Sequence, residues 1–192
     1  MFILFFLSFK LKSEMYYKVS LISIIGVLTF FACNQSYKNN VYFDIRQILE
    51  SDIDLSQNII GTDGSIFQKK YENTDLQIIH YIDSAECNEC SMKSLHYWRS
   101  TLEDTTFSKV GFFFIVWSDS YQNTQRALHN INFKYPVYMD LNGCFGNRNI
   151  FLKNKLYNTV LVNKENKIIL VGDFHGNNKL EALYRKLIEE NE

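Results

Sequence analysis

Cysteine is the residue type of this chain best suited to chemistry, and two of the four cysteines form a Cys-x-x-Cys pattern at Cys87 and Cys90. The pattern follows an apolar segment at 76–82 and opens a segment at 87–102 whose apolar residues recur at helical spacing. A helix N-terminus offers free backbone N–H groups and a partial positive charge, and both stabilise a thiolate. We therefore expect the pKa of the Cys87 thiol to lie below its free value of about 8.5.

The spacing also predicts how the two thiols act together. Cys90 lies nearly one helical turn after Cys87, so their sulfurs can form a reversible disulfide. We expect Cys87 to attack a substrate disulfide and Cys90 to resolve the mixed disulfide. Glu86 and Glu89 bring two carboxylates beside the forming thiolate and oppose the effect of the helix terminus. A less stabilised thiolate makes the disulfide form relatively more stable, which predicts a reducing potential.

The elements that must position these thiols alternate between strand and helix. The unbroken apolar run at 110–117 is typical of a central strand covered on both faces. We expect a hairpin at 59–67 around Asp63-Gly64, strands at 76–82, 110–117 and 135–139, helices at 87–102 and 121–131, a short helix within 143–152, a hairpin at 159–171 and a closing helix capped by Asn178. This order predicts an α/β domain whose mixed central sheet has helices on both faces.

The N-terminal part has the layout of an export signal. Met15 opens a short positive region, an apolar run follows at 19–32, and small Ala32 precedes Cys33. The run is shorter than the roughly 20 residues that span a bilayer. We therefore expect residues 1–33 to be an export signal with Met15 as the true start. Residues 34–56 are expected to be a tether with a short helix at 42–53, and residues 57–192 the folded domain.

The end of this signal resembles a bacterial lipoprotein box. The segment at 28–33 reads Leu-Thr-Phe-Phe-Ala-Cys, and in such a box the cysteine is diacylated and becomes the new N-terminus. The resemblance implies lipidation of Cys33, whose acyl chains would anchor the protein to a membrane. An ordinary signal peptide that removes Cys33, or a short membrane anchor, is the alternative.

The Cys-x-x-Cys after a strand, the apolar strand at 112–117, the hairpin around 163–166 and the closing helix together resemble a thioredoxin fold over about residues 57–190. With the export signal, the chain is similar to the envelope-anchored TlpA/ResA-like thioredoxins of bacteria. The resemblance implies a three-layer sandwich that exchanges thiols and disulfides with exported proteins, facing the periplasm. It implies Cys87 as nucleophile, Cys90 as resolving thiol, an upstream thiol electron donor and no cofactor.

The chain departs from that family at the loop expected to face the disulfide. The family places a cis-proline just before the first strand of the hairpin, and that position falls on Tyr157 or Asn158. A non-proline cis bond costs about 2.5–4 kcal/mol, so trans bonds are expected there. Tyr157 and Asn158 are the candidate substrate-binding residues, in a loop that we expect to be reshaped. Glu86 also stands where the family carries tryptophan.

Other functions of the same residues stay open. The domain could be a non-catalytic lipoprotein that binds a protein partner. A zinc site would need His96 and Cys144 as further ligands, and a copper site like that of Sco-like chaperones would use His175. We expect no metal site, and we expect Cys144 to be a buried free thiol. With 20 basic and 21 acidic residues, no basic surplus points to nucleic acid as a partner.

Overall fold

A computed structural model of the chain describes residues 41–42, 44–49, 51–55, 59–64, 67, 74–83 and 92–191. The chain divides into two units, Met1–Asp44 and Ile45–Glu192. Of the first unit, the structure describes residues 41–42 and 44, which are helical. Cys33, Cys87 and Cys90 lie outside the described residues, so the predictions for the lipid anchor and for the dithiol remain predictions.

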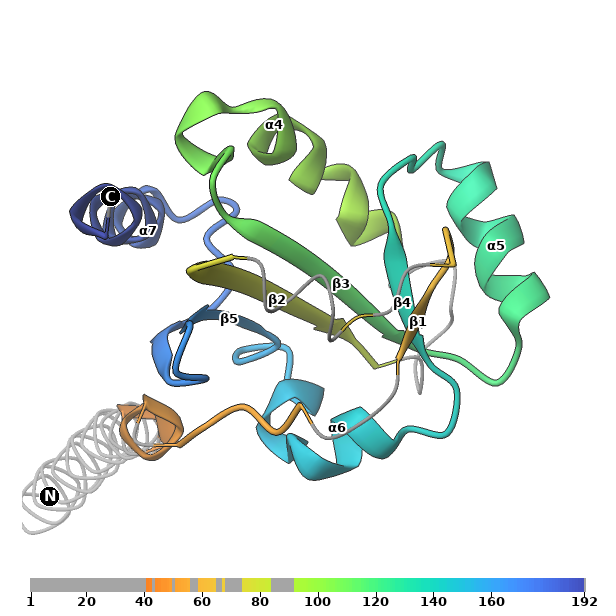
Figure 1. Ribbon diagram of the computed structural model, residues 1–192, viewed down its shortest axis with the longest axis horizontal. Helices are drawn as coiled ribbons and strands as arrows, with labels where there is room; N and C mark the ends of the chain where they lie inside the picture. The colour runs from red at the N-terminus through yellow and green to blue at the C-terminus, as the bar shows by residue number, and fades with distance from the viewer. Residues whose placement is uncertain are drawn as a thin grey trace, which may run out of the picture. The chain divides into compact units, whose positions relative to one another are not determined.

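The second unit is built on a six-stranded mixed sheet in the order β1-β4-β3-β2-β5-β6 (Figure 1). Its three central strands are β2 (Leu76–Ile82), β3 (Gly111–Trp117) and β4 (Val137–Asp140). These strands are parallel to one another, as expected for βαβ units. All seven residues of β2 are buried, which explains its nearly continuous apolar sequence.

The outer strands are antiparallel to the strands that they join. β5 (Thr159–Asn163) pairs with β2, and β6 (Ile168–Val171) pairs with β5, so the predicted hairpin is confirmed. Asn166 has a positive φ of 66° in the turn between them, a conformation that asparagine tolerates. β1 (Ile60–Gly61) pairs with β4 at the other edge of the sheet.

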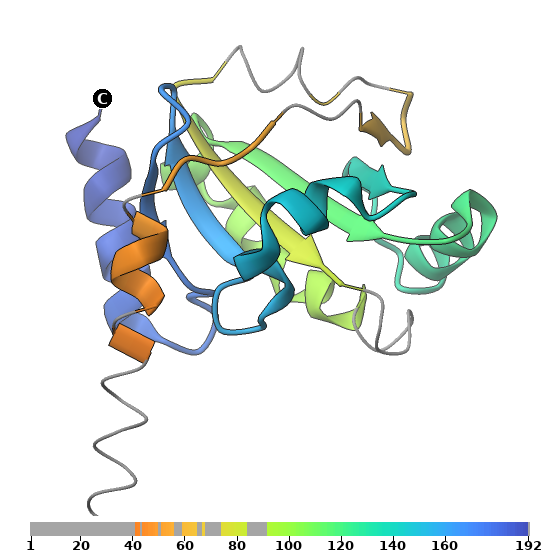
Figure 2. The ribbon, with the colours of Figure 1, turned by 90° about the horizontal axis from the view of Figure 1, so that it is seen from below.

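Helices cover both faces of this sheet (Figure 2). One face carries α4 (Trp98–Glu103), α5 (Tyr121–Asn130) and α7 (Asn178–Glu190), whose buried side chains form one apolar cluster with those of β2 and β3. The other face carries α6 (Cys144–Arg148), and Figure 1 shows α4 and α6 on opposite sides of the sheet. The mixed sheet between two helical layers confirms the predicted α/β architecture. The described residues also include three short 3-10 helices, η1 (Lys93–His96), η2 (Thr105–Phe107) and η3 (Ile150–Lys153).

The two faces are filled by alternate residues of the strands. Ile78 and Ile82 of β2 belong to the cluster under α4 and α7. Tyr81 points to the opposite face, where its ring centroid lies 6.0 Å from that of Phe145 in α6. Because side chains alternate along a strand, β2 contributes to the apolar core on each face of the sheet. A shift of its pairing by one residue would move each set of side chains to the wrong face.

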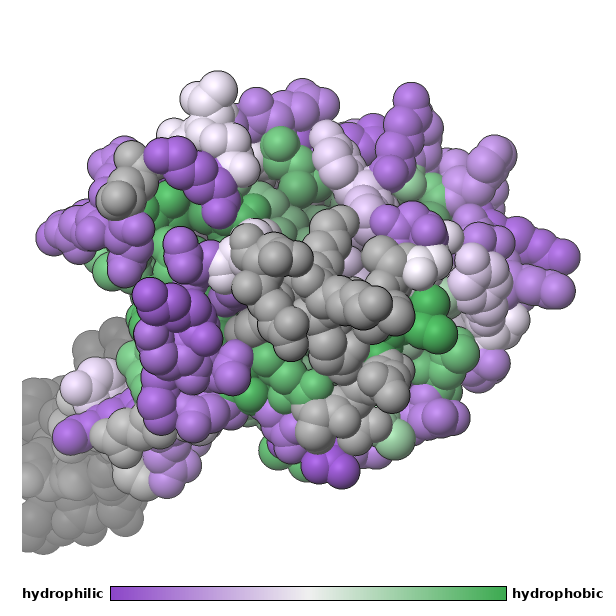
Figure 3. Space-filling model, in the orientation of Figure 1, coloured by the Kyte–Doolittle hydropathy of each residue, from purple (hydrophilic) through white to green (hydrophobic). Residues whose placement is uncertain are grey.

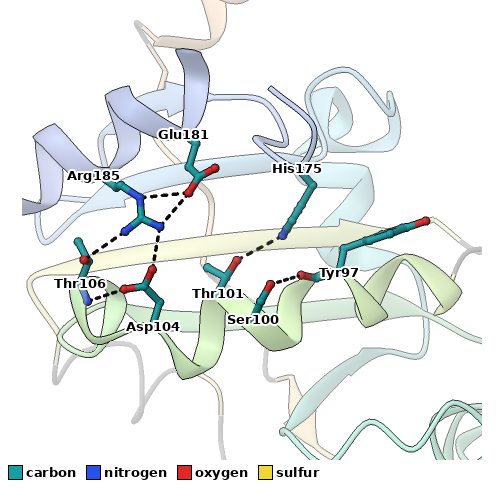
Figure 4. A network of polar contacts seen from close by, with 8 residues as sticks. All are labelled: Tyr97, Ser100, Thr101, Asp104, Thr106, His175, Glu181 and Arg185. Atoms are coloured by element: carbon teal, nitrogen blue, oxygen red, sulfur yellow. Dashed lines mark hydrogen bonds and ion pairs between the residues drawn. The ribbon is translucent and has the colours of Figure 1, made fainter. Parts of the chain in front are cut away.

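A polar network fastens α7 to the segment after α4 (Figure 4). Arg185 donates to Asp104 at 2.7 Å and to Glu181 at 2.8 Å, and its guanidinium lies 5.1 Å from the Phe107 ring centroid. Asp104 also caps η2 by accepting from the backbone N–H of Thr106 at 2.9 Å. The hydrogen bond from Arg185 is the main reason that the pKa of Asp104 lies below its usual value.

The structure differs from the sequence prediction at several element ends. The Asp63-Gly64 turn is present, but β1 pairs with β4, and Phe67 is helical. The helix expected at 42–53 is described as far as residue 49, residues 51–53 are not helical, and Ile53 is buried beside a bridge between Asp52 and Lys167. The cap of α7 is Asn177, whose side chain accepts from the N–H of Leu180, and not Asn178.

Candidate functional site

Several strands begin or end on the same side of the sheet, at the C-terminal ends of its parallel strands. Because β2, β3 and β4 are parallel, their C-terminal ends lie together there. From β2 it passes through Asp83 into the segment that contains Cys87 and Cys90, and it is described again from Met92, which is fully buried. The antiparallel strand β5 begins beside these C-terminal ends, where Thr159 pairs with His80. The candidate residues Tyr157 and Asn158 therefore lie beside the point where β2 ends.

The loop before β5 is tied directly to β2. The backbone N–H of Tyr81 donates to the carbonyl of Asn158 at 2.8 Å, and the Asn158 side-chain amide donates to the carbonyl of Tyr81 at 3.1 Å. The N–H of Tyr157 donates to the carbonyl of Asn154 at 2.8 Å. The Tyr157 side chain is buried, whereas Asn158 is partly exposed. No cis peptide bond occurs in the described residues, which include both of these positions.

A buried histidine stands behind this loop. His80 is 2% exposed, and its Nδ1 lies 2.7 Å from the hydroxyl of Thr159, which donates to Asn158 Oδ1 at 3.4 Å. Burial lowers the pKa of His80 to about 4, although Asp173 acts in the opposite direction, so the imidazole is neutral at pH 7. The His80 and Trp98 ring centroids are 5.2 Å apart. Their Nε2 and Nε1 atoms have no hydrogen-bond partner within the described part of the chain.

A second histidine lies on the loop between β6 and α7. His175 contacts Asp173 through its Nδ1 at 2.6 Å and Thr101 through its Nε2 at 3.4 Å; Figure 4 shows it reaching Thr101 of α4. Burial opposes ionisation of Asp173, but hydrogen bonds from the His175 ring and backbone outweigh it and hold the pKa of this carboxyl below its usual value. The ring of His175 also lies edge-on to Trp98, with centroids 4.5 Å apart. His80 and His175 thus flank the same indole.

The opposite face of the sheet is organised by a buried carboxylate at the end of β4. Asp140 accepts hydrogen bonds from the backbone N–H groups of Phe145 and Gly146 at 3.2 and 3.0 Å, and from the Tyr81 hydroxyl at 3.2 Å. Burial raises the pKa of the Tyr81 phenol, and Asp140 adds to this effect. A Cβ on residue 146 would lie 2.5 Å from Tyr81 Cζ, so the close approach of α6 requires glycine there.

Cys144 opens α6 beside a mostly apolar pocket. It is a free thiol and is partly exposed, so the expectation that it is buried was wrong. The pocket has a volume of about 290 Å³, and its wall includes the exposed side chains of Ile60 and Leu141. Figure 3 shows an apolar area in the same part of the molecule, near β1.

Among the described residues, no group of three or more His, Cys, Asp and Glu side chains is arranged to hold a metal ion. His175 is engaged with Asp173 and Thr101. Cys87 and Cys90, which the zinc and copper alternatives share, lie outside the described residues, whereas Cys144 is described as a free thiol. Within that same part of the chain, no helix combines the length and the apolar character needed to cross a membrane.

Solved structures are similar to this chain, whereas no protein-family model and no curated protein matches it. A mutant of PrxQ from Xylella fastidiosa has 12% identity and a TM-score of 0.53, over 71% of this chain and 95% of that one. The thioredoxin domain of a thiol-disulfide oxidoreductase from Bacteroides vulgatus has 12% identity and a TM-score of 0.52, over 72% and 98%. The N-terminal domain of PilB from N. meningitidis has 14% identity and a TM-score of 0.50, over 68% and 90%. These likenesses establish a thioredoxin-like fold, as predicted.

Two polar residues that lie near the C-terminal ends of β2 and β4 were not identified from the sequence. Asp140 comes one residue after the strand predicted at 135–139, and His80 lies inside the strand predicted at 76–82; neither was a candidate site residue. The burial of His80 could have been predicted, because it lies two residues from both Ile78 and Ile82 and therefore faces the same helical core as they do. No such signal marks Asp140, whose partners are distant Tyr81 and the start of a helix too short to predict firmly.

Proposed function

We propose that this protein is a thiol–disulfide oxidoreductase of the bacterial cell envelope that reduces disulfides through Cys87 and Cys90. The observation that carries the proposal is a Cys-x-x-Cys pattern placed directly after β2 of a thioredoxin-like sheet. The loop at Tyr157 and Asn158 supports the proposal, because Asn158 is hydrogen-bonded to Tyr81 near the end of that strand. Thiols and disulfides of exported proteins are the substrates proposed.

The chemistry uses two successive exchanges. The Cys87 thiolate attacks one sulfur of a substrate disulfide, so a mixed disulfide forms and the first substrate thiolate leaves. The Cys90 thiolate then attacks the Cys87 sulfur, which releases the second substrate thiolate and leaves a Cys87–Cys90 disulfide. The substrate gains two electrons and takes two protons from solvent. An upstream dithiol returns two electrons by the reverse exchange and is itself oxidised to a disulfide.

The same proposal places the domain outside the cytoplasm. Residues 1–33 are proposed as a lipoprotein-type export signal, residues 34–56 as a tether with a short helix, and residues 57–192 as the thioredoxin-like domain. A diacylated Cys33 would hold the domain at a membrane, facing the periplasm.

Replacement of Cys87 by serine is expected to abolish reduction of insulin by dithiothreitol beyond the uncatalysed rate. Serine keeps the size of the side chain but does not form a thiolate at neutral pH, so the first exchange cannot begin. Turbidity of precipitating insulin B chain measures the rate with the full chain in detergent. Cys90→Ser is expected to accumulate mixed disulfide, because the second exchange is missing.

The matched control is Cys144→Ser, which removes a partly exposed thiol outside the proposed pair and should leave the rate unchanged. The proposal is wrong if the wild-type chain is no faster than dithiothreitol alone or if Cys87→Ser keeps the full rate. Redox titration of the wild-type chain tests the reducing role, which a potential above about −150 mV would contradict.

Replacement of Cys33 by alanine is expected to release the protein from the membrane fraction. The acyl chains contribute about 0.8 kcal/mol per buried methylene, and no thiol remains to carry them. Expression in a bacterium fed radiolabelled palmitate, followed by fractionation, measures both label and location. Retention of label by Cys33→Ala would refute lipidation at this residue, and Cys144→Ala is the control that should keep both.

A non-catalytic, partner-binding role is the second candidate. It is favoured by the lack of proline at Tyr157 and Asn158, and by the bond from the Tyr157 N–H to Asn154, which occupies a backbone donor of this loop. In this case the cysteine pair would be a structural disulfide, and it would resist dithiothreitol in the folded protein.

A further inference from the structure

The hydrogen bonds behind the loop at residues 157–158 form a continuous chain from the interior to that loop. Thr159 stands at the centre of the chain, with His80 on one side at 2.7 Å and Asn158 on the other at 3.4 Å. Thr159 is completely buried and His80 almost completely, so the contact between them is shielded from solvent. Asn158 closes the chain by donating its amide to the carbonyl of Tyr81.

The two contacts of Thr159 are satisfied together in one assignment of donors and acceptors. With the single hydroxyl proton of Thr159 on Asn158 Oδ1, the hydroxyl oxygen accepts from His80 Nδ1 in its Nδ1–H tautomer. That assignment needs a proton on Nδ1, and because burial keeps His80 neutral at pH 7 the proton is carried by the Nδ1–H tautomer. With its Oδ1 held by Thr159, the Asn158 side chain is fixed with its amide toward β2.

His80 is itself held in place from the side of the helical core. The Trp98 ring lies against it, and Phe114 of β3 lies at a centroid distance of 6.3 Å. The hydrogen-bond chain therefore starts in the buried helical core and ends at a partly exposed residue beside the end of β2. Such an arrangement suits a loop that must hold its shape without a proline.

We propose that His80 and Thr159 are positioning residues for disulfide exchange: through Asn158 they hold the 157–158 loop in the shape that receives the polypeptide around a substrate disulfide. The inference rests on the proposed oxidoreductase function. It assigns neither residue contact with the reacting sulfurs. Loss of these hydrogen bonds should therefore weaken the binding of polypeptide substrates and leave the exchange chemistry at the cysteines unchanged.

The test compares Thr159→Val with Thr159→Ser in the full chain. Valine matches threonine in shape but lacks the hydroxyl, so we expect KM for insulin to rise about fivefold with kcat unchanged, the effect of losing one neutral hydrogen bond. Serine keeps the hydroxyl and should restore the wild-type KM. The rate with 2-hydroxyethyl disulfide, which is too small to need the loop, should stay within twofold for both variants.

Two further variants separate loop positioning from a general loss of packing. Thr124→Val removes a buried hydroxyl that bonds only within its own region, to Ser120 at 3.2 Å, and should not change KM. Asn158→Ala removes the partly exposed side chain at the end of the hydrogen-bond chain and should raise KM as Thr159→Val does. This variant tests the positioning role if Thr159→Val does not fold.

The outcomes distinguish this inference from the function on which it rests. An inactive wild-type chain overturns the proposed function. An active wild type whose Asn158→Ala and folded Thr159→Val variants keep the wild-type KM overturns the positioning role alone. Equal losses with insulin and with 2-hydroxyethyl disulfide would also overturn it, because they would place the defect at the cysteines.

Discussion

Replacement of Trp98 by alanine is expected to lower the free energy of unfolding by about 3–5 kcal/mol, the range for truncating a large buried aromatic side chain. Trp98 is completely buried on the inner side of α4. Its ring packs edge-on against Phe114 of β3 at 5.4 Å and against Phe174 at 5.3 Å between centroids. The indole therefore joins the sheet to the loop that leads into α7, and its removal leaves a cavity that no neighbour can fill alone.

Urea unfolding followed by circular dichroism measures this loss. The neighbouring residue supplies a matched control, because Tyr97 is 65% exposed and Tyr97→Ala should change the unfolding free energy by no more than about 0.5 kcal/mol. Trp98→Phe keeps an aromatic ring and also removes the buried N–H that has no partner among the described residues, so it should cost clearly less than alanine. Equal stability of Trp98→Ala and wild type would contradict the packing described for α4.

The sequence predicted the central strands and the final hairpin to within a residue or two. β2 was predicted with its observed bounds, and β3 begins one residue later than expected. These strands are buried on both faces, so each reads as an apolar run that no amphipathic helix would show. The hairpin of β5 and β6 was equally readable, because two apolar runs flank a short polar turn at 163–166.

Pairings between distant segments could not be read in the same way. The turn at Asp63-Gly64 is local and was recognised, but the partner of Ile60 is Met139, far along the chain. Burial of Ile53 likewise depends on a bridge to the turn that follows β5. Hydrophobic spacing reports which face of an element is buried, and it does not report which element covers it.

The candidate site shows the same division between local and distant information. The chemistry proposed for Cys87 and Cys90 was inferred from their spacing and from the strand before them, all within one stretch of sequence. The chain from His80 through Thr159 to Asn158 exists only because β2 and β5 pair in one register. A shift of that register by one residue would turn both His80 and Thr159 to other neighbours, so the sequence alone could not place them together.

His80 should make the stability of this protein depend on pH between about 6.5 and 4. Its pKa is lowered by burial from 6.5 to about 4 in the folded state. Between these values the unfolded chain binds a proton that the folded chain does not, so stability falls as the pH falls from about 6.5 to 4. The shift corresponds to about 3 kcal/mol at its full extent.

Urea unfolding at half-unit steps from pH 7.5 to 4 measures this dependence. His80→Gln cannot take up a proton, so its free energy of unfolding should be flatter in that window, even if it is lower throughout. His129→Gln alters an exposed histidine on α5 and should keep the wild-type slope. Asp173, whose pKa is lowered in the folded state, should cost stability in both chains as the pH falls through and below its usual value near 3.8. An equal slope in wild type and His80→Gln between pH 6.5 and 4 would show that the imidazole is not held neutral by burial.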